Sequence, residues 1–80
     1  MTQNQLRKNI IYNIDTGSCM SFLVRGVLNE PDCDVPAMDI EVGVQQMVQD
    51  GLLTRKGTED WYTVSKTGWV VWQQLLKETK

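Results

Sequence analysis

Aliphatic residues recur at helical spacing near the start of the chain. Leu6, Ile10 and Ile14 are spaced four residues apart, which places them on one stripe of an amphipathic helix. The polar run that follows contains Gly17, a residue suited to a helix C-terminus. We therefore expect the first helix to end close to Gly17.

The next apolar segment predicts a second helix that carries Phe22, Leu23, Val24, Val27 and Leu28. Its broad apolar face consists of Met20, Leu23, Val24 and Val27. Ser18 or Ser21 is the expected N-cap, because a hydroxyl oxygen can accept from the free N–H groups of the first turn. Pro31 ends this segment, and a loop rich in aspartate runs from there to Pro36.

The clearest helical pattern lies in the middle of the chain. Its apolar stripe is Ile40, Val44, Met47 and Val48. The opposite, polar face is Glu41, Gln45, Gln46 and Gln49. We expect this third helix to begin between Pro36 and Asp39, and Gly51 in a left-handed conformation to end it.

After the third helix, the pattern changes to one typical of strands. Residues 52–55 form a short, partly apolar segment, and residues 61–64 are aromatic and β-branched, with a period-2 alternation. The polar turn between them, 56–60, contains a glycine, so the two segments predict an antiparallel hairpin. A last helix follows Gly68. The order of elements predicts a mostly helical α+β domain that spans residues 1–80.

Composition narrows the possible chemistry. The 80 residues include no histidine, which removes the usual general base and the commonest metal ligand. Cys19 and Cys33 form neither a CxxC pair nor a disulfide framework, so we expect two free thiols in a reducing compartment. We therefore expect a protein that is not an enzyme, with no catalytic residues, no metal and no cofactor.

The apolar runs are also too short for a membrane. None exceeds four residues, whereas a spanning helix needs about 20. The first nine residues contain no apolar stretch long enough for a secretory signal. The sequence therefore predicts a cytoplasmic protein with no membrane association.

Two runs of sequence carry a resemblance to a known fold family. Residues 44–53 look like the end of a recognition helix that leads through a glycine and two leucines into a wing strand. Residues 61–68 resemble the second wing strand and its Ser-x-x-Gly exit into a helix. In this order, and over residues 6–76, the chain resembles the winged helix-turn-helix domains of small PadR-like, MarR-like and phage-encoded proteins. The resemblance implies three helices, a two-stranded wing hairpin and a C-terminal helix.

The resemblance also implies that the chain binds double-stranded DNA as a transcription regulator, with the third helix in the major groove and the wing on the backbone. The implied groove-facing residues are Glu41, Val42, Gln45, Gln46 and Gln49. A glutamine amide can hydrogen-bond adenine N6 and N7 together. The implied phosphate contacts are Arg55, Lys56 and Lys66 from the wing, with Arg7, Lys8 and Arg25 from the first two helices. The alternative is that the glutamines form a solvated face and that Arg55 and Lys56 keep the hairpin tip soluble.

The charge of the chain is unusual for a DNA-binding domain, which is more often basic. The net charge is −2, and residues 29–50 contain six acidic and no basic residues. A carboxylate near phosphate is repelled, although acids at a helix start also suit the helix dipole. The sequence therefore keeps a second function open, a non-catalytic winged-helix module in which the acidic segment and a tryptophan face bind a protein partner.

The last helix carries two tryptophan side chains, more than the core of so small a domain can be expected to bury. Trp69 and Trp72 are three residues apart, and Leu76 continues their face. Core packing accounts for part of this face. The remainder predicts a homodimer whose interface includes Trp69, Trp72 and Leu76.

Overall fold

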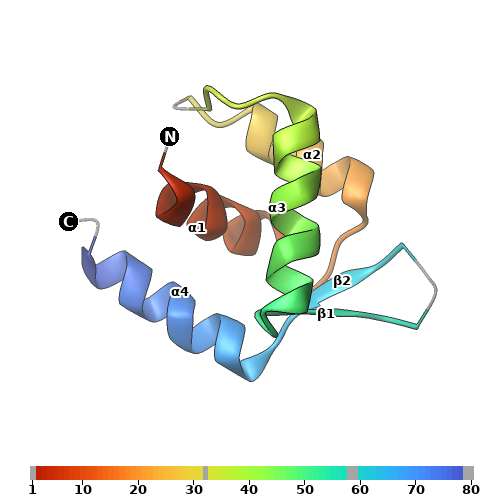
Figure 1. Cartoon of the computed structure of the whole chain (residues 1–80), viewed down its shortest axis with the longest axis vertical. Helices are drawn as coiled ribbons and strands as arrows, with labels where there is room; N and C mark the ends of the chain where they lie inside the picture. Colours follow the sequence, from red (N-terminus) through yellow and green to blue (C-terminus); the bar gives the residue numbers. More distant parts are fainter. Residues whose placement is uncertain (1, 32, 58–59, 79–80) are drawn as a thin grey trace.

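The computed structural model describes residues 2–31, 33–57 and 60–78. Its elements are α1 (Gln3–Ile14), α2 (Met20–Leu28), α3 (Ala37–Gln49), β1 (Leu53–Arg55), β2 (Tyr62–Val64) and α4 (Lys66–Glu78). The predicted mostly helical α+β class is confirmed. Asp32 of the acidic segment and residues 58–59 of the predicted hairpin turn lie outside the described residues. In Figure 1, α1 and α4 lie side by side, and the hairpin projects from the far side of α3.

The ends of α1 are defined by local backbone chemistry. Thr2 and Gln5 form a capping box, in which each side chain accepts from the backbone N–H of the other. The helix ends at Asp15, whose φ is +50° and whose N–H donates to the Ile11 carbonyl. This end lies at the first residue of the polar run 15–18, where the sequence predicts that the helix stops. Gly17, with φ +148°, instead turns the chain toward the hairpin.

The start of α2 differs from the expectation. Cys19 is the N-cap residue and makes no side-chain capping hydrogen bond, so neither Ser18 nor Ser21 caps this helix. The Asp60 carboxylate, 40 residues away in sequence, accepts from the Met20 N–H at 3.1 Å. Ser18 pairs with Tyr62 in an isolated antiparallel bridge. Both contacts hold the α1–α2 connection against the hairpin.

The core lies where α1, α2 and α3 meet. It includes the fully buried side chains Ile10, Ile11, Ile14, Leu23, Val27, Ile40, Val44 and Met47. The apolar stripe of α3 that the sequence indicated faces inward, apart from Val48, which is only half-buried. Pro36 precedes α3, and Gly51, with φ +80°, ends it as expected.

The hairpin and α4 close the fold on one side. Leu53 pairs with Val64 and Arg55 with Tyr62, and the buried Tyr62 ring joins the core. Ser65 links the hairpin to α4, because its hydroxyl accepts from the Gly68 N–H at 3.0 Å and donates to the Gly51 carbonyl at 2.6 Å. No helix in the described part of the chain combines the length and apolar character that crossing a membrane requires.

Candidate binding surfaces

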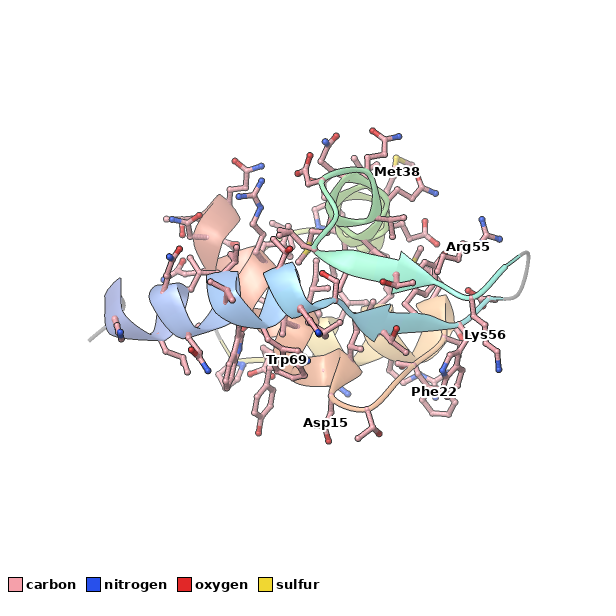
Figure 2. All side chains as sticks on the ribbon, turned by 90° about the horizontal axis from the view of Figure 1, so that it is seen from below. Asp15, Phe22, Met38, Arg55, Lys56 and Trp69 are labelled. Carbon is pink, nitrogen blue, oxygen red and sulfur yellow. The ribbon has the colours of Figure 1, made fainter. Side chains whose placement is uncertain are left out.

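The outer face of α3 is open to solvent. Met38 is 71% exposed and Val42 is 58% exposed, and Gln45 and Gln49 continue the same stripe toward the C-terminal end of the helix. Figure 2 shows Met38 pointing away from the body of the molecule. Asp39 and Glu41 are also exposed, whereas α3 contains no lysine or arginine. The N-terminal half of this face is therefore apolar and acidic, and the C-terminal half carries amides.

A groove separates the amide half of α3 from the hairpin. Its volume is about 250 Å³, and it is lined by Gln45, Val48, Gln49, Arg55 and Tyr62. Arg55 comes from β1, so the hairpin lines the groove on the side opposite the two glutamines of α3. The structure thus brings together three residues that the sequence assigned to one DNA-binding surface.

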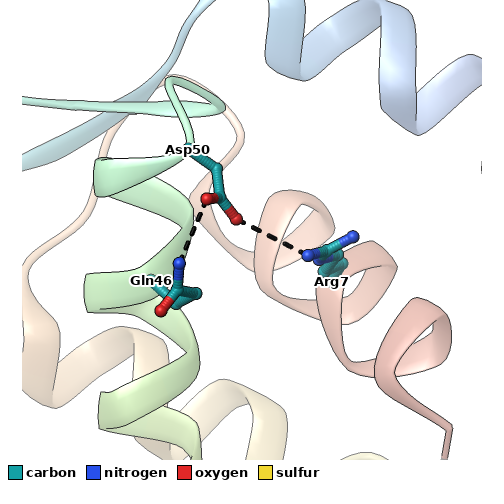
Figure 3. Close-up of polar contacts among 3 residues, drawn as sticks. All are labelled: Arg7, Gln46 and Asp50. Atoms are coloured by element: carbon teal, nitrogen blue, oxygen red, sulfur yellow. Dashed lines mark hydrogen bonds and ion pairs between the residues drawn. The ribbon is translucent and has the colours of Figure 1, made fainter.

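Gln46 lies on a different side of α3, next to α1. Its Nε2 donates to Asp50 Oδ1 at 3.1 Å, and Asp50 Oδ2 lies 3.5 Å from Arg7 Nη2 (Figure 3). Gln46 also lines a small hollow with residues of α1. The Gln46 amide and Arg7 are therefore engaged with Asp50 and are not presented with Gln45 and Gln49.

The other cations suggested by the sequence lie in different places. Arg55 and Lys56 lie on the hairpin (Figure 2). Lys66 is the first residue of α4 and not part of the wing. The Arg25 guanidinium lies 5.8 Å from the centre of the Phe22 ring, and Figure 2 shows Phe22 on the opposite side of the molecule from Met38. The structure therefore separates Arg25 from the outer face of α3.

A second surface runs between α1 and α4. Two adjoining hollows of about 320 and 470 Å³ share Tyr12 and Trp72. Leu76 lines the first hollow and Trp69 lines the second. The Trp69 and Trp72 rings pack edge to face, with centroids 5.6 Å apart. We call this surface the α1–α4 groove, and it contains all three residues that the sequence assigned to a dimer interface.

Trp72 and Tyr12 contribute differently to this groove. Trp72 packs partly against the core, and its buried indole Nε1 has no hydrogen-bond partner among the described residues. Tyr12 is 67% exposed, and sequence reasoning missed it because it lies off the Leu6/Ile10/Ile14 stripe. Its four-residue spacing from Lys8 was the available signal for a second stripe on α1.

Among titratable side chains, Cys19 has an environment that changes its chemistry. Its Sγ lies 3.3 Å from the Ser21 hydroxyl. This hydrogen bond, followed by one from the Phe22 backbone, lowers the pKa of the Cys19 thiol. No group of three potential metal ligands converges within the described ranges.

Comparisons with known proteins identify no relative of this chain. No family model matches the sequence, and neither the curated proteins nor the solved structures contain a significant match. The proposals below therefore depend on the geometry of the two surfaces.

Proposed function

We propose that this chain is a non-catalytic winged-helix domain that binds double-stranded DNA and regulates transcription. The observation that carries the proposal is the groove between α3 and the hairpin. Gln45 and Gln49 line it from α3, and Arg55 lines it from β1. In this proposal α3 enters the major groove, Gln45 and Gln49 contact base edges, and Arg55 and Lys56 contact phosphates. Glu41 and Val42, one turn earlier on α3, approach the DNA major groove in this proposal.

The arrangement of the elements supports the winged-helix part of the proposal. A hairpin follows the third helix directly and leads into a fourth. The Ser18–Tyr62 bridge adds the α1–α2 connection to the edge of that hairpin. This bridge braces the two-stranded hairpin against the helical part of the fold.

A fluorescence-anisotropy titration with a short random-sequence duplex, at low and at moderate salt, tests the DNA proposal. We expect binding that weakens as salt rises, with a slope of about 0.9 per phosphate neutralised. Replacing Arg55 and Lys56 by alanine removes two cations and should lower that slope by about 2. Replacing Arg25 and Lys77 removes the same charge away from α3 and is the matched control.

Selectivity provides the second part of this test. We expect Gln45→Ala/Gln49→Ala to reduce discrimination among genomic fragments more than it reduces affinity for random DNA, because amides read bases and cations hold phosphates. An absence of binding at low salt would contradict the proposal. Equal losses from the Arg55/Lys56 pair and the Arg25/Lys77 pair would contradict the proposed surface.

A second candidate function is protein binding by the N-terminal half of α3. The exposure of Met38 and Val42 beside Asp39 and Glu41 favours it, because an apolar patch flanked by carboxylates suits a basic amphipathic helix. An amphipathic Lys/Leu peptide, titrated while amide NMR signals are followed, tests this candidate. We expect shifts confined to residues 37–45 that Met38→Ser/Val42→Ser abolishes, and no shifts with a matched Glu/Leu peptide.

A further inference from the structure

Three residues of α1 form a stripe along the α1–α4 groove. Lys8, Tyr12 and Asp15 are spaced i, i+4 and i+7, and all three line the groove. Lys8 lies at the end where α4 contributes Leu76, and Asp15 lies at the end where it contributes Trp69. Tyr12 and Trp72 lie at the centre. The groove thus has Lys8, Glu30 and Leu76 at one end, and Asp15 and Trp69 at the other.

Asp15 is an unfavourable residue for its position in a single chain. Its carboxylate lies at the C-terminal end of α1, where the helix dipole is negative. Asp15 is exposed and takes part in no ion pair among the described residues. A cation from outside the chain would compensate this charge.

We propose that a second copy of the chain occupies the α1–α4 groove, related to the first by a two-fold axis over Tyr12 and Trp72. This two-fold axis runs across the groove from Tyr12 to Trp72, so it exchanges the two ends of the groove in the second copy. Lys8 of each copy then meets Asp15 of the other, and Leu76 meets Trp69. The charged ends are therefore self-complementary, and the aromatic centres of the two copies cover each other. Because this contact uses the opposite side of the molecule from Met38, it does not depend on DNA binding (Figure 2).

The other charge in the groove refines the proposal. Glu30 lines the same end as Lys8 and would approach Asp15 of the second copy. Like charges repel, so Glu30→Gln should strengthen the association. The Lys8 ammonium has three donors, so an interaction within its own chain does not prevent it from binding a second carboxylate.

Charge exchange between Lys8 and Asp15 tests the proposal. Sedimentation equilibrium of the whole chain should show a concentration-dependent dimer. Lys8→Glu places a carboxylate opposite Asp15 in both contacts, and Asp15→Lys places an ammonium opposite Lys8, so each variant should associate at least tenfold more weakly than the wild type. An equimolar mixture of the two should form a heterodimer, because both ionic contacts are then complementary. Lys8 and Asp15 lie about 10 Å apart along one helix, so recovery on mixing requires contact between chains.

The aromatic centre is tested separately. Tyr12→Ser should weaken the dimer at least tenfold, whereas Val70→Ser should leave it unchanged, because Val70 is 55% exposed on α4 but does not line the groove. Circular dichroism of each variant establishes that it is folded. A wild-type chain that stays monomeric up to millimolar concentration would overturn the proposal. So would single variants that still dimerise, or a mixture of the charge variants that fails to associate.

Discussion

Gly68 occupies a position that no larger residue can share. A Cβ atom there would overlap the Leu52 carbonyl oxygen and lie 2.7 Å from Val64 Cγ1. We expect Gly68→Ala to lower the free energy of unfolding by about 3 kcal/mol, because α4 must move away from the hairpin. Gly51 is the matched control, since it has a φ of +80° and nothing within 4 Å of its added Cβ. Gly51→Ala should cost only the strain of the left-handed conformation, about 1 kcal/mol. Urea titrations measure both values, and equal losses would contradict the steric argument.

The Cys19 thiol should react at lower pH than an ordinary cysteine. The Ser21 hydroxyl lowers the pKa of Cys19, so more thiolate is present at a given pH, and thiolate is the reactive form. We expect Ser21→Ala to shift the pH profile of Cys19 alkylation to higher pH and Ser21→Thr, which keeps the hydroxyl, to change it little. Iodoacetamide labelling followed by peptide mapping gives the rate at each cysteine. Cys33 is the internal reference, and a parallel change there would indicate altered folding instead of an altered hydrogen bond.

At the scale of the element, α4 depends on one hydroxyl group. Ser65 caps the first turn of α4 through the Gly68 N–H and holds the Gly51 carbonyl at the end of α3. We expect Ser65→Ala to destabilise the fold by about 1–2 kcal/mol, because it removes both contacts. Ser65→Thr should restore most of the loss. Tryptophan fluorescence, to which Trp69 and Trp72 of α4 contribute together with Trp61, follows unfolding in urea. A Ser65→Ala chain as stable as the wild type would show that the cap contributes little.

The elements were predictable from the sequence where their causes are local. The stripe Ile40/Val44/Met47 and the stop at Gly51 define α3 within a few residues, so its position follows from spacing alone. The start of α2 was not predictable, because its N–H group is satisfied by Asp60 from the hairpin. The sequence assigned Gln45, Gln49 and Arg55 to one proposed DNA-binding surface but did not predict the groove that they line. The turn of Gln46 toward Asp50 was not predictable either, since it depends on where α1 packs. The spacing of residues in the sequence shows which of them belong to one element. The packing of the elements against each other decides which residues lie on the same surface.

At the scale of the whole molecule, charge and surface are divided between two sides. The outer face of α3 carries apolar, acidic and amide side chains, and Arg55 of the hairpin lines the groove beside its C-terminal half. The α1–α4 groove lies on the side of Trp69 and Asp15, away from Met38 (Figure 2). A variant on one side should therefore leave the direct contacts of the other intact. DNA affinity would still fall on loss of the dimer, because two linked copies bind a paired site more tightly than one.

Asp50 links α1 to the end of α3. Its carboxylate adds negative charge beside the proposed DNA surface and engages both Arg7 and Gln46 (Figure 3). We expect Asp50→Asn to raise DNA affinity several-fold at low salt, since it removes a charge that phosphate repels and releases Arg7 toward the backbone. The stability cost should stay below about 1 kcal/mol, because both partners of the ion pair are partly exposed. Anisotropy titrations of Asp50→Asn and of Glu78→Gln, an equal charge change at the last residue of α4, separate a local effect from a general one. If Asp50→Asn weakens DNA binding, the carboxylate is organising α3 for its ligand and the repulsion argument is wrong.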